Sequence, residues 1–326
     1  MRSPEAARAI PELVRDGVLS PERAAPLLAA ARGEIVSVRG ELRTLVGIAV
    51  ALVTAGVGLF LEKHHEAIGP TTIAIVLAAA AAGTLVAVVR RAPAFSWTRS
   101  ADSDWLVDGL LVLTIALLGA DLAWIETQFT PLGPSWPWHL LVVSLVTAAL
   151  AVRFDSTVGW TLALSTFAAW RGVAVSPRAD HVARALFGGE LELRANLLLC
   201  AAVFAGLGRL AERFDRKRHF EPATTFLAAL AAAVAFVSGL ADEELWPLWA
   251  IALAVLGAGV TWWSFGRRRL ALFALGALAM YAGATRFLFE LPSSDGIGCF
   301  WFAASTVGAI ALLVGIHRRF RAGERS

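Results

Sequence analysis

The sequence predicts an all-α fold: a polytopic transmembrane helix bundle of about ten spans with a short N-terminal cytoplasmic helical hairpin. Of its 326 residues, 57% are apolar and 17% are charged, whereas soluble domains carry about 45–50% apolar and about 25% charged residues. The apolar residues come in blocks close to the ~20 residues that cross a ~30 Å hydrocarbon core. The net charge of +3 is small, so it gives no indication of nucleic-acid binding.

Residues 1–40 are expected to form a separate, water-facing pair of helices, and residues 41–326 the membrane bundle. Ser3-Pro4-Glu5 and Ser20-Pro21-Glu22 each place serine at an N-cap, proline at the first helical position and an acid in the first turn. A hairpin this short is too small for a core of its own. We therefore expect it to dock on the membrane surface, on cytoplasmic loops or on a protein partner. Its helices are expected near 4–16 and 21–32.

The remaining apolar blocks predict ten membrane spans. The fourth and fifth are joined by Arg153-Phe154-Asp155 alone, and we expect Asp155 to be the N-cap of the fifth span, which makes the pair a tight hairpin. The spans are expected near 42–61, 70–89, 105–125, 138–152, 156–175, 194–210, 222–240, 247–265, 270–289 and 297–316.

The distribution of Lys and Arg predicts that both termini are cytoplasmic, because loops on that side carry the excess of basic residues. Of the 29 Lys and Arg residues, all but six fall in segments assigned to the cytoplasmic side. The loop at 176–193 departs from the rule, because two of the six lie within it. The six residues assigned to the outer side are Lys63, Arg171, Arg178, Arg184, Arg194 and Arg286.

Small residues four positions apart recur along the predicted spans. This spacing lets helix backbones approach closely and predicts a compact bundle. The pairs are Ala79/Gly83, Ala202/Gly206, Ala279/Gly283, Ala304/Gly308 and Ala311/Gly315.

Standard catalytic and cofactor patterns are missing from the sequence. His65-Glu66 begins an H-E-x-x-H motif, but Gly69 stands where the second zinc ligand belongs. Gly206-x-Gly208-x-x-Ala211 has the spacing of a dinucleotide fingerprint, yet it ends a predicted span and follows no strand. The sequence therefore predicts no catalytic residue, no cofactor and no established metal site.

A predicted outer loop concentrates two acids and two histidines: Glu62, His64, His65 and Glu66. Such a loop is a candidate metal or pH site, since histidine titrates near neutrality. The alternative is a solvated loop between two spans.

Asp121 is the most unusual residue of the predicted spans. An acid at membrane depth is costly unless it is paired or protonated, so such residues are functional candidates. Arg171 and Arg286 fall at a similar outer depth, and His139 begins the fourth span on the same side. The functional hypothesis is a polar cluster of these residues that opens outward, around an anionic or zwitterionic solute. The alternative is a structural ion pair, or arginines that reach the headgroups.

Asp108 lies in the first turn of the third predicted span. The positive end of the helix dipole stabilises a carboxylate there, so a structural role competes with a role as a proton site.

The N-terminal region resembles a bacterial family of predicted membrane proteins, the domain of unknown function 2157 family. The resemblance is carried by Leu13, the segment Gly17-Val18-Leu19-Ser20-Pro21-Glu22 with Ala24 and Ala25, the basic stretch to Arg43, and a glycine-containing first span from Gly47 to Phe60. It covers roughly residues 10–90. Family members tend to have Asn-Trp just after the first span, where this chain has Glu62-Lys63-His64-His65-Glu66. The resemblance implies a fold and a location in the bacterial inner membrane, but no activity.

Three classes of function remain open from the sequence. The first is a scaffold, sensor or accessory subunit in the lipid bilayer that contacts a protein partner through residues 1–40. The second is a secondary transporter of a small solute built from two inverted five-helix repeats, and the third is an intramembrane enzyme. The oligomeric state stays open.

Overall fold

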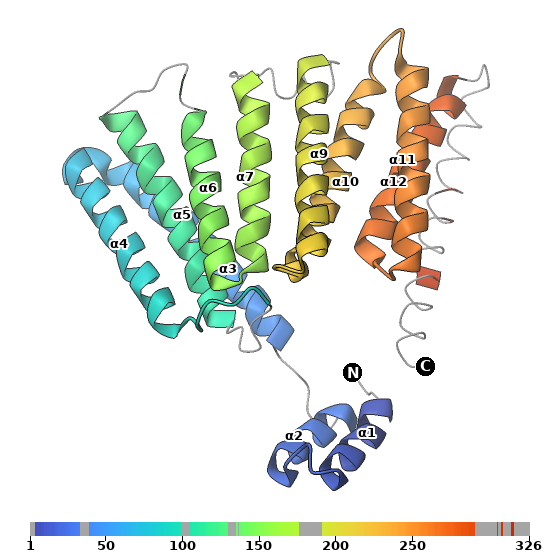
Figure 1. Ribbon diagram of the computed structural model, residues 1–326. Coiled ribbons are helices and arrows are strands. Elements are labelled where there is room, and N and C mark those ends of the chain that lie inside the picture. Colours follow the sequence, from blue (N-terminus) through green and yellow to red (C-terminus); the bar gives the residue numbers. More distant parts are fainter. Residues whose placement is uncertain are drawn as a thin grey trace. The chain divides into compact units, whose positions relative to one another are not determined.

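The computed structural model describes residues 4–32, 39–98, 105–129, 135, 137–175 and 191–290, with 305, 308, 314 and 315. Throughout these residues the regular elements are helices, and no strand occurs among them (Figure 1). The chain divides into two compact units, residues 1–49 with 308–326, and residues 50–307. The division falls inside α3 (Arg39–Ile68).

The first unit contains two short helices that pack against each other, α1 (Pro4–Arg15) and α2 (Pro21–Arg32). Gly17 has a φ of 71°, which allows the chain to reverse after α1. A small core of Ile10, Ala24 and Ala31 is buried between the helices, so the expectation that the hairpin has no core of its own is wrong.

The second unit is a series of helices that alternate in direction (Figure 1). Each of the pairs α4/α5, α6/α7, α9/α10 and α11/α12 packs closely, and further contacts join α7 to α9 and α10 to α11. The helices are α4 (Pro70–Arg91), α5 (Trp105–Gln128), α6 (Trp138–Phe154), α7 (Thr157–Val175), α9 (Leu191–Phe214), the 3-10 turn η2 (Arg218–Phe220), α10 (Glu221–Gly239), α11 (Trp246–Gly266) and α12 (Leu270–Glu290).

Six helical segments of the described chain are long and apolar enough to cross a membrane. Each of the first nine predicted spans coincides with a helix, but α3, α6 and α7 are not among these six, and α6 is a shorter apolar helix of 17 residues. The tenth predicted span, 297–316, lies outside the described residues apart from isolated positions. The count of ten therefore remains a prediction. The six segments are Pro70–Arg91, Leu106–Gln128, Leu191–Phe214, Arg218–Gly239, Trp246–Gly266 and Leu270–Phe287.

The predicted outer loop at Glu62–Glu66 is wrong as a loop, because α3 continues as a helix to Ile68. The drop in hydropathy does not end this helix, since Glu and Lys favour a helical backbone. The reversal comes at Gly69, whose φ of 84° suits glycine, and Pro70 then begins α4.

The predicted capping role of Asp155 is also wrong. Asp155 ends α6 in the left-handed conformation, with a φ of 60°. The next residue, Ser156, caps α7 instead: its Oγ accepts the Gly159 N–H at 3.1 Å. The carboxylate of Asp155 is engaged elsewhere, by Lys217 and His219.

Glycines set the closest helix contact of the second unit, between α11 and α12. A Cβ atom at Gly283 would lie 2.6 Å from the Ala250 carbonyl oxygen, and one at Gly276 would lie 2.8 Å from the Gly257 carbonyl oxygen. The predicted pair Ala279/Gly283 thus lies at a close backbone contact. Gly83 and Gly206, from two other predicted pairs, face open space.

Candidate functional site

Two ends of the second unit carry its charged groups. The Lys217 end comprises residues 92–98, Asp155-Ser156, residues 215–221 and Arg267–Arg269. The Asp242 end comprises the turn 240–245 and the adjoining ends of α5, α6, α7, α9 and α12 (Figure 1).

A buried charge cluster lies at the Lys217 end. The side chains of Lys217 and Asp155 are 7% and 8% exposed, and their Nζ and Oδ1 atoms lie 2.7 Å apart. His219 Nε2 lies 2.9 Å from the same carboxylate oxygen. Since each buried charge requires a partner, the cluster fixes the α6–α7 turn against the α9–α10 turn.

Aromatic residues of the segment after α4 complete the surroundings of Lys217. The Lys217 N–H donates to the Trp97 carbonyl oxygen at 2.8 Å, and the ammonium lies 5.1 Å from the centre of the Phe95 ring. Arg216 lies over the Trp97 ring at 4.7 Å. Lys217 therefore joins three stretches of chain that are distant in sequence, by charge, hydrogen bond and cation–π contact.

A second ion-pair network lies at the same end, around Glu221 in the first turn of α10. The Glu221 side chain is 5% exposed. Its two carboxylate oxygens accept hydrogen bonds from the two terminal nitrogens of the Arg269 guanidinium, which is a bidentate pairing. Thr225 Oγ1 donates to it at 2.9 Å. Arg267 contacts Glu212 of α9 at 2.6 Å and lies over the Trp263 ring at 4.4 Å. The network holds the α11–α12 turn against α9 and α10.

The most deeply buried cation, Arg194 of α9, lies at the Asp242 end. Arg194 is 1% exposed. Its Nη1 lies 3.0 Å from Asp242 Oδ2, and its Nη2 donates to the Ser238 carbonyl oxygen at 3.3 Å. The guanidinium also lies 5.1 Å from the centre of the Trp249 ring. These contacts tie the start of α9 to the turn between α10 and α11.

Donors around Asp242 hold the pKa of its carboxyl below the ordinary value. The Leu245 N–H donates at 3.0 Å, the Arg194 guanidinium lies at 3.0 Å, and the Glu244 N–H donates at 3.3 Å. Each favours the ionised form. A carboxyl with a lowered pKa stabilises the fold at pH values above its unfolded pKa of about 3.9, and this contribution is lost as the pH falls through the lowered folded value.

We therefore expect the stability difference between the parent protein and Asp242→Asn to be constant above about pH 5 and to shrink below about pH 4. Thermal melts of both proteins between pH 2.5 and 6 measure this difference. Glu243→Gln, at the exposed neighbouring position, is the control and should track the parent at every pH. A stability difference between the parent and Asp242→Asn that stays constant down to about pH 2.5 would contradict the lowered pKa of Asp242.

The structure places the four residues of the predicted polar cluster toward the Asp242 end, but Arg171, Arg286 and His139 contact separate partners. Arg171 donates to Asn196, Arg286 donates to the Leu240 carbonyl at 3.4 Å, and His139 Nδ1 lies 3.0 Å from Glu126 Oε2. Asp121 is 9% exposed, and its buried Oδ1 has no hydrogen-bond partner among the described residues. The described chain thus does not bring Asp121 into contact with the other three.

Of the weaker candidates from the sequence, the structure describes the side chains of His64 and Asp108. His64 is exposed on α3, and its ring lies 4.8 Å from that of Phe60. The side chains of Glu62, His65 and Glu66 lie outside the described part, as does most of the loop 176–193. Asp108 is half-buried in the first turn of α5 and makes a contact there. No three His, Cys, Asp or Glu side chains of the described chain converge as a metal site.

The ion pairs that organise both ends were not found from the sequence. Asp155 and Lys217 do lie on the same predicted side of the membrane, which is a signal, but 62 residues separate them. Arg194 was identified as an outer arginine, and nothing local marks its burial. Pairing of this kind depends on which turns meet in space.

Comparison with known protein families gives a match over the N-terminal part of the chain. Residues 11–160 match the family model of predicted membrane proteins called DUF2157. The DUF2157 match runs from α1 to the start of α7 and so extends beyond the region of the sequence resemblance. It supports the assignment of the chain as a predicted membrane protein with several apolar helices. No curated protein and no solved structure matches.

Proposed function

We propose that the chain is a membrane-embedded scaffold or accessory subunit of the bacterial inner membrane that binds a protein partner through its N-terminal helical hairpin. The observation that carries the proposal is the surface of that hairpin. Its small core holds α1 and α2 together, while three large apolar side chains stay exposed: Leu13 at 42%, Val18 at 73% and Leu27 at 49%. Exposed apolar side chains that gather into a patch mark interaction sites, and we infer that these three do so on the hairpin.

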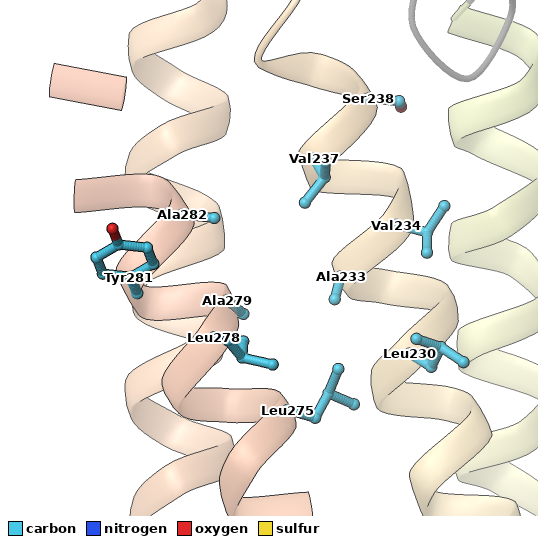
Figure 2. Close-up of a pocket in the computed structure, with 10 residues that line it drawn as sticks. All are labelled: Leu230, Ala233, Val234, Val237, Ser238, Leu275, Leu278, Ala279, Tyr281 and Ala282. Carbon is cyan, nitrogen blue, oxygen red and sulfur yellow. The ribbon is translucent and has the colours of Figure 1, made fainter. Parts of the chain in front are cut away.

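The interior of the second unit supports a scaffold more than a carrier of polar solutes. A cavity of about 480 Å³ lies between α10 and α12, where Leu275 and Leu278 point toward α10 (Figure 2). The Tyr281 hydroxyl points away from the cavity and lies 2.8 Å from Ser305 Oγ. The helices that line the cavity are continuous, whereas transporter sites are typically formed by broken helices with polar groups.

The two alternatives have less support in the described residues. A transporter would draw on Asp121, whose buried oxygen lacks a hydrogen-bond partner there, since intramembrane acids mark ion and proton paths. An enzyme would need polar groups that converge on one pocket. The arginines and the histidine of the Asp242 end instead bind separate partners.

A crosslinking experiment tests the proposed partner site. A photo-crosslinking residue at position 18 is expected to capture a discrete partner in native membranes. Leu13→Ser combined with Leu27→Ser should reduce that capture more than tenfold, because burying one leucine contributes about 1.5–3 kcal/mol. The yield of the crosslinked band, normalised to the amount of chain in the membrane, is the measurement.

The matched control is the double variant Glu12→Ser with Arg23→Ser, which changes exposed polar positions of the same two helices. Its crosslinked yield should equal that of the parent. Equal yields from the leucine variant and the polar control would show that the apolar surface does not bind a partner. Thermal melts of the purified variants check that the bundle is intact.

A further inference from the structure

A second cavity, of about 320 Å³, opens at the Lys217 end between α9, α10 and α11. Its walls differ in chemistry from one end to the other. Val255, Leu256 and Val260 of α11 form an apolar wall, while Arg209, Glu212 and Glu221 bring charged groups to the opposite end. A cavity with one apolar and one charged end fits an amphiphilic ligand.

The apolar part of this cavity lies deep along α11. Val255 precedes the end of the helix at Gly266 by eleven residues, which is roughly 16 Å at 1.5 Å per residue. That distance is about half of a ~30 Å hydrocarbon core. The cavity therefore runs from the charged helix ends to the depth of the acyl chains of one leaflet.

The charged end has one cation beyond those used for internal pairing. Glu212 contacts Arg267, and Glu221 is held by Arg269. Arg209 lines the cavity and forms no ion pair or hydrogen bond within the described chain. Its guanidinium is exposed on α9 and is available to an anionic group at the cavity mouth.

Open space remains in the middle of the cavity wall. Gly259 lies between the deep residues and the mouth, and a Cβ atom built there would meet no atom within 4 Å. A side chain can therefore start from this position without its Cβ striking a neighbouring helix, and we expect a leucine here to occupy part of the cavity.

We propose that this cavity binds one phospholipid with an anionic headgroup, with an acyl chain along α11 and the headgroup phosphate at Arg209. The apolar depth suits an acyl chain, and at the mouth Arg209 offers a cation beyond the ion pairs that occupy Glu212 and Glu221. A soluble anion would leave the apolar wall uncovered, and a purely apolar molecule would leave the mouth without a counter-charge. This site uses no residue of the hairpin.

The test uses the full chain, purified in detergent and titrated with phosphatidylglycerol, phosphatidylcholine or glycerol 3-phosphate. Ligands that bind the native state raise the melting temperature with a saturable dependence on concentration. Phosphatidylglycerol should give the largest rise and glycerol 3-phosphate none. Arg209→Gln should weaken phosphatidylglycerol binding on the order of five-fold, the effect of one basic charge near a lipid surface. Gly259→Leu should abolish the saturable rise.

Two variants serve as controls. Arg213→Gln removes an exposed charge from the same helix away from the cavity, and Gly206→Leu adds a side chain at an exposed glycine of α9 that also faces open space. Both should bind phosphatidylglycerol as the parent does. Equal rises with both lipids in every variant would overturn the proposal in favour of general lipid solvation. An equal rise with glycerol 3-phosphate would overturn it in favour of a soluble anion. Arg209→Gln decides the question alone if Gly259→Leu does not melt cooperatively.

Discussion

Replacing Asp155 with asparagine is expected to destabilise the protein by about 3–5 kcal/mol, the usual cost of removing one partner of a buried ion pair. The Lys217 side chain is 7% exposed, so the variant would leave an ammonium charge inside the protein without its carboxylate. Asparagine keeps nearly the same shape and tolerates the left-handed backbone that Asp155 adopts. The loss is therefore a loss of charge pairing.

Unfolding midpoints in detergent measure this loss, with Asp215→Asn as the control. Asp215 also has a positive φ, but its side chain is 78% exposed and lies 3.9 Å from Arg218. The control should change stability by less than about 0.5 kcal/mol. Adding Lys217→Met to Asp155→Asn should restore part of the loss, because the second change removes the unpaired charge. Additive losses in the double variant would contradict the pairing.

The second large effect is expected for Gly257→Ala, at the contact of α11 with α12. The new methyl group would lie 2.6 Å from the Gly276 carbonyl oxygen and against the Met280 backbone, so the two helices must separate. Extra atoms in a packed interior destabilise by about 1–3 kcal/mol, and we expect the upper part of that range because backbone atoms, which cannot change rotamer, meet the methyl group.

Gly259→Ala is the matched control for this prediction. It lies two residues away on the same helix and faces open space, so any general effect of alanine in α11 is shared by both variants. Thermal melts should place Gly259→Ala between the stability of the parent protein and about 1 kcal/mol above it, because alanine favours a helix interior over glycine. Comparable melting temperatures for the two variants would show that α11 and α12 do not pack through their glycines.

The positions of the helices were largely predictable, because membrane-length apolar blocks identify helices without any knowledge of their partners. The predicted 70–89, for example, is Pro70–Arg91 in the structure. Errors came at helix ends. Glu62–Glu66 was predicted as a loop because hydropathy falls there, but a helix ends where its backbone must turn, at Gly69.

The contacts between helices were less predictable. The small-residue spacing identified Ala279/Gly283 correctly, yet the same spacing at Gly206 faces open space, and Gly257 was not singled out at all. The small-residue pattern shows where another helix could approach the backbone. Which helix packs there depends on the arrangement of all the helices in the bundle. The ion pairs are hard to predict for the same reason, because their partners are distant in sequence: 48 residues separate Arg194 from Asp242.

That separation has a consequence for how the protein is made. The ribosome completes α9, with Arg194 near its start, before it synthesises the turn that supplies Asp242. Until that turn exists, the arginine has no carboxylate in the position it occupies in the finished fold. A long arginine side chain near a helix end can reach the polar interface in the meantime. The Arg194–Asp242 pair can therefore form only after α10 and its following turn have been synthesised.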